Sequence, residues 1–150
     1  MTGPGRRAIL AVPAALAGTH AAAAQQAPRE DFAAAERAIL AGRAPVAEGI
    51  AIEVPQLSEN GNSVDVAVKV DSPMTAADRV TAIHILAEKN PYPRVATFTL
   101  SPRAGRAEVA TRIRLASTQT VTVIAETSGG RVHRASREVI VILGACVDGG

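Results

Sequence analysis

Valine alternates with polar or small residues over residues 64–70, where the sequence reads VDVAVKV. Successive side chains of a β-strand point to opposite faces, so this alternation predicts a strand with one buried face. Similar short runs follow Gly49 along the rest of the chain. They cover residues 50–54, 79–88, 94–100, 106–115, 120–126 and 131–143. Segments with Gly, Pro, Asn or Ser separate these runs, and Asn60-Gly61 predicts a hairpin turn before the valine run.

About seven closely spaced strands with no helical pattern between them favour an antiparallel β-sandwich of the immunoglobulin-like type. One helix is predicted before the sandwich, because Phe32, Ala35, Ile39 and Leu40 fall on one helical stripe that ends before Gly42. Aromatic residues make up only 2% of the chain, so the core must consist mainly of Val, Ile, Leu and Ala. The expected fold class is therefore mainly β, with one N-terminal helix.

The first residues have the layout of an export signal. Arg6 and Arg7 precede an apolar stretch too short to anchor the chain in a bilayer, and a run of small residues ends at Ala24. The paired arginines and the modest hydrophobicity favour the twin-arginine route, with a general secretory signal as the alternative. We therefore expect residues 1–24 to be removed, the mature chain to begin near Gln25, and the protein to be periplasmic.

The charge of the chain gives no reason to expect a nucleic-acid partner. Lys and Arg number 16 and Asp and Glu number 14, and the two arginines of the signal account for the whole excess of +2. The remainder is therefore neutral, unlike a typical nucleic-acid-binding domain. No later apolar run reaches the roughly 18 residues that a membrane span needs, so no membrane contact is expected either.

The sequence contains none of the common catalytic strings. It lacks G-x-S-x-G, H-E-x-x-H, C-x-x-C and a Gly-rich loop between a strand and a helix. We therefore expect that the protein is not an enzyme and needs no cofactor.

A blue-copper site is one alternative hypothesis, since such a site takes two His, one Cys and an axial Met. The candidates are His84, His133, Cys146 and Met74, but no histidine follows the cysteine. We expect His84 on the polar face of its strand and His133 on a solvated strand, with no metal bound.

Cys146 is the only cysteine and has no internal partner for a disulfide. In an exported protein it is either buried and inert, paired with another molecule, or kept as a reactive thiol. It lies on a short Gly-rich tail after the last predicted strand, so we expect an exposed thiol on a flexible arm. The expected arm residues are Gly144, Ala145, Val147, Asp148, Gly149 and Gly150.

Several segments resemble the SoxY family, the sulfur-compound carriers of the bacterial thiosulfate-oxidising (Sox) system. They are Asn90-Pro91, the run TRIRLA at residues 111–116, Gln119-Thr120, and the Gly-rich tail with Cys146. The resemblance implies a covalent carrier that holds a sulfur oxyanion substrate on this cysteine. It also implies a heterodimer with a SoxZ-like subunit and transient visits to SoxAX, SoxB and, in complete systems, SoxCD.

The tail departs from the usual Gly-Gly-Cys-Gly-Gly of that family. Ala145 replaces a glycine, and Val147-Asp148 precedes Gly149-Gly150. Val is stiffer than Gly and Asp adds charge, so an inactive paralogue or a non-catalytic binding module is the alternative function. The expected organisation is a signal at 1–24, a helix and sandwich at 25–143, and a swinging tail at 144–150.

Overall fold

The structure is a computed structural model and describes residues 29–145. The expected export signal and the residues from Cys146 onward lie outside this range. Within it the chain forms one α-helix, one 3₁₀ turn and eight strands. In chain order these are α1 (Phe32–Leu40), β1 (Ile50–Glu53), β2 (Leu57–Asn60), β3 (Val64–Val70), β4 (Val80–Ala87), β5 (Arg94–Thr99), η1 (Pro102–Ala104), β6 (Ala107–Ile113), β7 (Gln119–Thr127) and β8 (Val132–Leu143).

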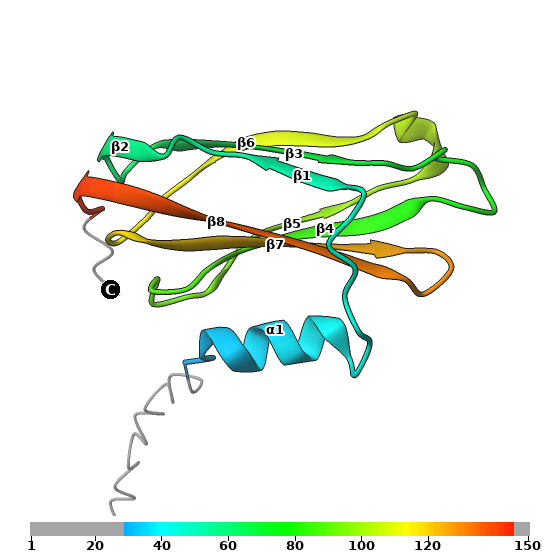
Figure 1. Cartoon of the computed structure of the whole chain (residues 1–150), viewed down its shortest axis with the longest axis horizontal. Helices are drawn as coiled ribbons and strands as arrows, with labels where there is room; N and C mark the ends of the chain where they lie inside the picture. The colour runs from blue at the N-terminus through cyan, green and yellow to red at the C-terminus, as the bar shows by residue number, and fades with distance from the viewer. Residues whose placement is uncertain (1–28, 146–150) are drawn as a thin grey trace, which may run out of the picture.

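The strands form two sheets that pack face to face, which confirms the predicted sandwich (Figure 1). The smaller sheet has the strand order β1-β3-β6, and the larger sheet has the order β2-β8-β7-β4-β5. All pairs are antiparallel except β2 with β8, which is parallel. No helix among residues 29–145 is both long and apolar enough to cross a membrane.

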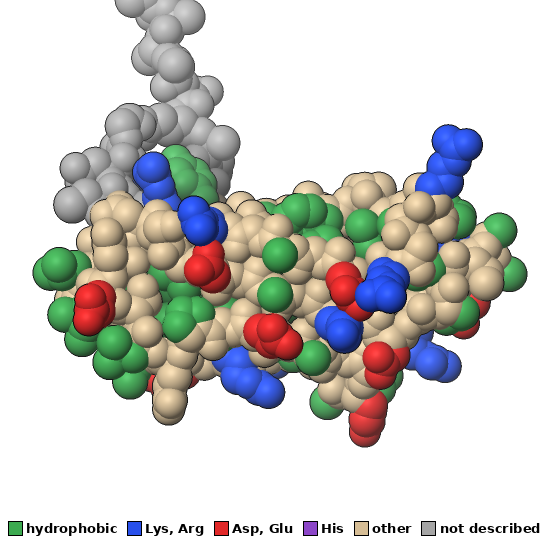
Figure 2. Space-filling view, turned by 90° about the horizontal axis from the view of Figure 1, so that it is seen from above, with side chains coloured by type: hydrophobic (Ala, Val, Ile, Leu, Met, Phe, Trp, Pro, Cys, Tyr) green, Lys and Arg blue, Asp and Glu red, His purple; other side chains and the backbone are tan. Residues whose placement is uncertain are grey.

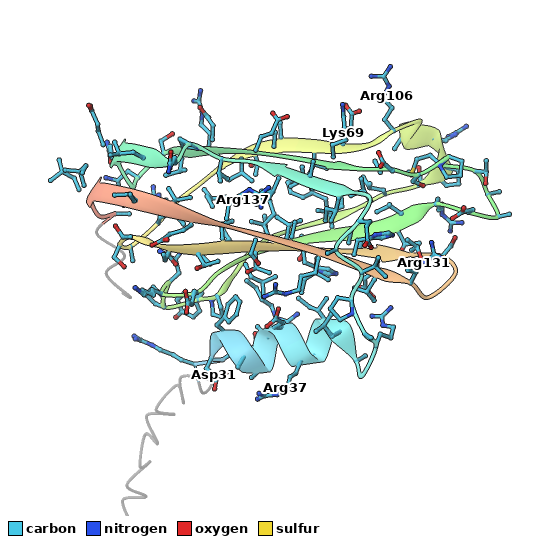
Figure 3. All side chains as sticks on the ribbon, viewed as in Figure 1. Asp31, Arg37, Lys69, Arg106, Arg131 and Arg137 are labelled. Carbon is cyan, nitrogen blue, oxygen red and sulfur yellow. The ribbon has the colours of Figure 1, made fainter. Side chains whose placement is uncertain are left out.

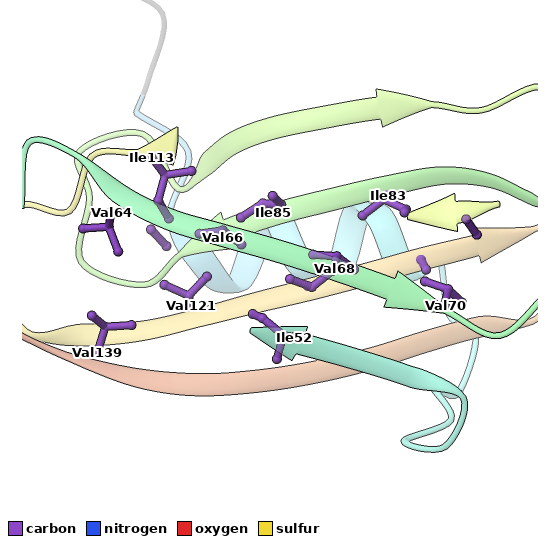
Figure 4. Packing of buried hydrophobic residues seen from close by; sticks show 14 of the residues in the cluster. Ile52, Val64, Val66, Val68, Val70, Ile83, Ile85, Ile113, Val121 and Val139 are labelled. Atoms are coloured by element: carbon purple, nitrogen blue, oxygen red, sulfur yellow. The ribbon is translucent and has the colours of Figure 1, made fainter. Parts of the chain in front are cut away.

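Aliphatic side chains from both sheets fill the space between the layers (Figure 4). In β3 the four valines are buried and the residues between them are not, as the alternation predicts. From the larger sheet, Ile83, Ile85 and Val121 meet them and are fully buried. Burial of this apolar surface is the main force that holds the two sheets together.

Helix α1 covers part of the outer face of the larger sheet (Figure 1). The Asp31 carboxylate caps the helix by accepting a hydrogen bond from the Ala34 N–H at 2.6 Å. Ala35 and Ile39 on the inner stripe are buried, as predicted. They contact Leu86, Ile124 and Val132 in a second, smaller apolar cluster.

Two local expectations were wrong. Asn60-Gly61 does not close a hairpin, because the strand before it, β2, joins β8 in the larger sheet while β3 belongs to the smaller one. The segment therefore passes from one layer of the sandwich to the other. Strand β2 itself was not predicted, because its sequence LSEN lacks an alternating apolar pattern.

The outer face of the smaller sheet is polar. Acidic and basic side chains are interspersed on it (Figure 2), and Lys69 and Arg106 point away from the sandwich (Figure 3). Asp65 pairs with Arg112 at 2.8 Å and Lys69 with Glu108 at 3.6 Å. A shallow hollow on this face is lined by small residues, by these paired charges and by Glu53.

Candidate functional site

The chain after β8 is held against the body of the sandwich up to Ala145. The Leu143 carbonyl accepts a hydrogen bond from the Gly61 N–H at 2.7 Å, and the Ala145 N–H donates to the Leu115 carbonyl at 2.9 Å. Ala145 is only 6% exposed. The expectation that the arm is free from Gly144 onward is therefore corrected, because Gly144 lies between two hydrogen-bonded residues.

Two glycines allow this close approach of backbones. A Cβ atom on Gly61 would lie 2.3 Å from the Leu115 carbonyl oxygen and 2.9 Å from the Ala145 nitrogen. On Gly144 it would lie 2.1 Å from the Ala116 carbonyl oxygen. Neither position accepts a side chain without movement of the backbone. Gly61 is therefore required by contacts with residues that are distant in the sequence, and not by the predicted hairpin turn.

The loop that receives the tail is fixed by two amides. Asn90 donates from Nδ2 to the Arg114 carbonyl at 2.8 Å, and its Oδ1 accepts from the Ala116 N–H at 3.0 Å. Gln119, which is 2% exposed, donates to the same Oδ1 at 2.9 Å and accepts from the Lys89 N–H at 2.8 Å. Gln119 is buried and Asn90 half-buried, and a hydrogen-bonded network of this kind holds a loop in one conformation.

Thr118 joins this loop to the last strand. Its Oγ1 accepts a hydrogen bond from the Val141 N–H at 2.9 Å. Leu115, whose side chain is fully buried in the main core, anchors the loop from the other side. We call Gly61, Asn90, Leu115, Thr118 and Gln119 the tail bracket. Asn90 and Gln119 were identified from the sequence only through the family resemblance, and Thr118 was not predicted.

Cys146 lies outside the described residues, as do Val147, Asp148, Gly149 and Gly150. Covalent geometry still limits where its thiol can be. Consecutive Cα atoms are about 3.8 Å apart and a cysteine side chain adds about 3 Å, so the sulfur lies within about 7 Å of the Ala145 Cα. Ala145, the residue before the cysteine, lies at the end of the sandwich that holds the tail bracket; the chain reaches this end after β8 (Figure 1).

The histidines serve other purposes. His133 is 8% exposed, not solvated as expected, because its Nδ1 pairs with the Glu48 carbonyl at 2.8 Å. His84 lies on the outer face of the larger sheet, where its Nε2 contacts Glu126 at 2.8 Å. Met74 is buried in the core on the other side of that sheet. In residues 29–145, no three His, Cys, Asp or Glu side chains gather in a way that would hold a metal ion.

Glu126 joins His84 to the end of α1. Arg43 donates to Glu126 at 2.6 Å and also to the Ile39 and Leu40 carbonyls at the helix C-terminus. Burial raises the pKa of Glu126, but the hydrogen bonds from Arg43 and His84 outweigh it, so the net pKa is lowered. The group is thus a structural ion cluster beneath the helix.

A family model described as sulfur oxidation protein SoxY matches residues 36–146 and so includes the cysteine. The solved structure of the sulfur carrier protein SoxY from Chlorobium limicola f thiosulfatophilum is 36% identical, with a TM-score of 0.57. That match covers 71% of this chain and 94% of the other. No match was found among curated proteins.

Two superoxide reductases are also similar in structure. The neelaredoxin from Ignicoccus hospitalis is 19% identical with a TM-score of 0.55, over 63% of this chain and 80% of that one. A superoxide reductase from Thermotoga maritima is 18% identical with a TM-score of 0.53, over 61% and 84%. At such identity the likeness shows the shared sandwich fold alone.

Proposed function

The chain belongs to the SoxY family of sulfur oxidation proteins, and we propose that it carries sulfur intermediates of thiosulfate oxidation covalently on the Cys146 thiol. The observation that carries this proposal is that the tail base, residues 143–145, is hydrogen-bonded to the sandwich. The Ala145 N–H donates to Leu115 of the tail bracket, and Cys146, the only cysteine of the chain, is the next residue. This supports a thiol carried at one end of the sandwich. A carrier needs such a group where other proteins can reach it.

The carrier chemistry balances with a heme cytochrome of the SoxAX kind as oxidant. The Cys146 thiol and thiosulfate join through a new sulfur–sulfur bond, which releases a proton and two electrons that pass one at a time to the heme cytochrome. Water then cleaves the bond to the terminal sulfone in a SoxB-like hydrolase, which releases hydrogen sulfate and leaves a persulfide on the cysteine. A SoxCD-like enzyme oxidises that remaining sulfur. The carrier supplies the attachment point and no catalytic group.

We place the protein in the periplasm as a heterodimer with a SoxZ-like subunit. Arg6 and Arg7 support twin-arginine export, a route that carries folded cargo. N-terminal sequencing of periplasmic protein should give a start close to Gln25, and recovery of Met1 there would contradict the export proposal. Co-expression and sizing test the heterodimer, since a monomer without affinity for the subunit would contradict it.

Intact-mass spectrometry tests the carrier function. After incubation with thiosulfate and the oxidising cytochrome, the protein should gain the mass of a thiosulfate adduct on Cys146. Cys146→Ser should show no adduct and retain its thermal stability, because a hydroxyl forms neither a persulfide nor a thiosulfonate. An adduct that persists in Cys146→Ser, or its absence from the wild type, would contradict the assignment and favour a non-catalytic module or an inactive paralogue.

The altered tail can be tested separately. If Val147 and Asp148 restrict access to partner enzymes, replacing both with glycine should raise the rates of loading and unloading. Thermal stability should stay within a few tenths of a kcal/mol, as for other surface changes. An unchanged or lower rate would mean that the pair is tolerated or recognised by a partner.

A further inference from the structure

Large apolar side chains are exposed beside the tail base. Leu57 is 51% exposed, Ile140 41%, Ile142 61% and Leu143 68%. They are four of the five large apolar side chains that are exposed among residues 29–145. We call these four residues the apolar stripe. An exposed apolar group of this kind in a soluble domain marks an interaction surface more often than chance.

Three residues of the stripe, Leu57, Ile140 and Ile142, lie on the outer face of the larger sheet, near the base of the tail. Ile140 and Ile142 alternate with the buried Val139 and Val141, so their side chains point away from the core. Leu57 is the register partner of Ile140 in β2 and lies on the same face. Leu143 ends the strand two residues before Ala145, and by the same alternation its exposed side chain points to the opposite side from that of Ile142.

Helix α1 does not cover this part of the sheet. Its buried residues contact Leu86, Ile124 and Val132, and Val132 is the first residue of β8. Ile140, Ile142 and Leu143 of the stripe are among the last residues of the same twelve-residue strand. A strand rises about 3.3 Å per residue, so roughly 26 Å separates Val132 from Ile140 along β8.

The short distance between the thiol and Ala145 limits which proteins can bind at the stripe while they react with the thiol. The sulfur lies within about 7 Å of the Ala145 Cα. An enzyme that takes this sulfur into a recess must bring the rim of the recess against the surface around Ala145. Ile142 and Leu143, at the end of β8, are part of that surface, and Ile140 and Leu57 continue from Ile142 on the outer face of the sheet.

We infer that the apolar stripe is the docking surface for the enzyme that loads Cys146, whose recess has an uncharged, apolar rim. This inference rests on the proposed carrier function. Burial of the stripe supplies binding energy at the moment when the thiol enters the recess. A small apolar surface also suits a carrier that must leave each enzyme after reaction, since small interfaces form transient complexes.

Steady-state loading kinetics with thiosulfate and the oxidising heme cytochrome test the inference. Ile142→Glu places a charge in the stripe, and Ala110→Glu is the matched control on the exposed outer face of the smaller sheet. We expect Ile142→Glu to raise the KM for the carrier about tenfold with an unchanged kcat, as for loss of an apolar anchor. Ala110→Glu should leave both constants unchanged. Alkylation of Cys146 by a small maleimide should proceed equally in all three proteins.

A longer tether provides a second test. Four glycines inserted between Ala145 and Cys146 add about 14 Å of reach, so the thiol no longer requires contact at the stripe. In this background, Ile142→Glu should change KM less than threefold. A penalty that stays tenfold would contradict the link between tether and docking.

Other occupants give different results, and each would overturn the inference. If Ile142→Glu abolishes binding of the SoxZ-like subunit, the stripe belongs to that interface. If it abolishes concentration-dependent self-association and leaves KM unchanged, the occupant is a second copy of the chain. Failure of the wild type to load at all would instead contradict the carrier function, whereas normal loading with an unchanged KM in Ile142→Glu contradicts only the docking surface.

Discussion

The outer face of the larger sheet has two regions of opposite character. At the covered end, α1 packs on Leu86, Ile124 and Val132, and the charged groups at its margin are paired. At the bare end, the apolar stripe is exposed and the tail base is held by backbone hydrogen bonds. Strand β8 runs through both, so the difference lies in what covers the strand and not in the sheet itself.

The covered end contributes to stability, and the bare end is available for binding partners. The covered end satisfies its polar groups and buries its apolar side chains within the chain, as a structural element does. The bare end keeps apolar side chains in water although the same strand could have carried polar ones. Such an arrangement is expected where a partner completes the burial. Changes at the covered end should therefore affect stability, and changes at the bare end should affect partner enzymes.

The largest effect is expected from truncation beneath the helix. Ile124→Ala should lower the free energy of unfolding by about 2–5 kcal/mol, because it leaves a cavity between α1 and the sheet. Ile142→Ala, at the bare end, should change it by less than about 0.5 kcal/mol. Urea unfolding of both variants measures the difference, and equal losses would contradict the comparison.

A smaller loss is expected when a Cβ atom is forced into the tail bracket. Gly61→Ala should destabilise by about 1–3 kcal/mol, because the new atom would meet the Leu115 carbonyl at 2.3 Å. Gly129→Ala is the matched control, since nothing lies within 4 Å of its Cβ position. Thermal unfolding compares the two variants. An unchanged Tm in Gly61→Ala would contradict the close contact of Gly61 with Leu115 and Ala145.

The ion cluster at the covered end predicts a pH dependence. The folded-state pKa of Glu126 is lowered from 4.5, so its stabilising effect is complete above that pH and is lost as the pH falls. Glu126→Gln should cost about 1–2 kcal/mol at neutral pH, since it removes charged hydrogen bonds to Arg43 and His84. The gap between wild type and variant should close as the pH falls below 4.5 and through the lowered pKa of Glu126. A gap in Tm that persists in acid would contradict this cause.

The helix cap should give the smallest effect. Asp31→Ala removes the acceptor of the Ala34 N–H and should cost about 1 kcal/mol. Asp65→Ala, which breaks an exposed pair with Arg112, should cost less than about 0.5 kcal/mol. Chemical denaturation resolves the two, and a larger cost for Asp65→Ala would contradict the role of the cap.

Local patterns predicted most of the architecture. The stripe that includes Ala35 and Ile39 placed the helix, and the valines of β3 placed a half-buried strand, because periodicity and burial are linked within one element. The predictions that were wrong concern residues whose contacts are distant in the sequence. Strand β2 pairs with β8, about eighty positions away in the sequence. His133 is buried where the Glu48 carbonyl accepts a hydrogen bond from its Nδ1.

The candidate site was predicted only in part. The lone Cys146 could be identified because no other cysteine exists, and the family resemblance assigned its role. The bracket around its base could not be derived, because Gly61, Leu115 and Ala145 come together only through the packing of the two sheets. A glycine required by a distant carbonyl looks the same in sequence as a glycine required by a turn.

The central claim is that the folded end of the sandwich extends to the residue before the thiol. Amide hydrogen exchange at Ala145 tests it most directly, because this N–H donates to the buried Leu115 carbonyl. We predict that the Ala145 amide is protected to a degree similar to that of Val141, whose N–H is bonded to Thr118. Exchange at the rate of an unstructured peptide would contradict the held tail base and the docking geometry that depends on it.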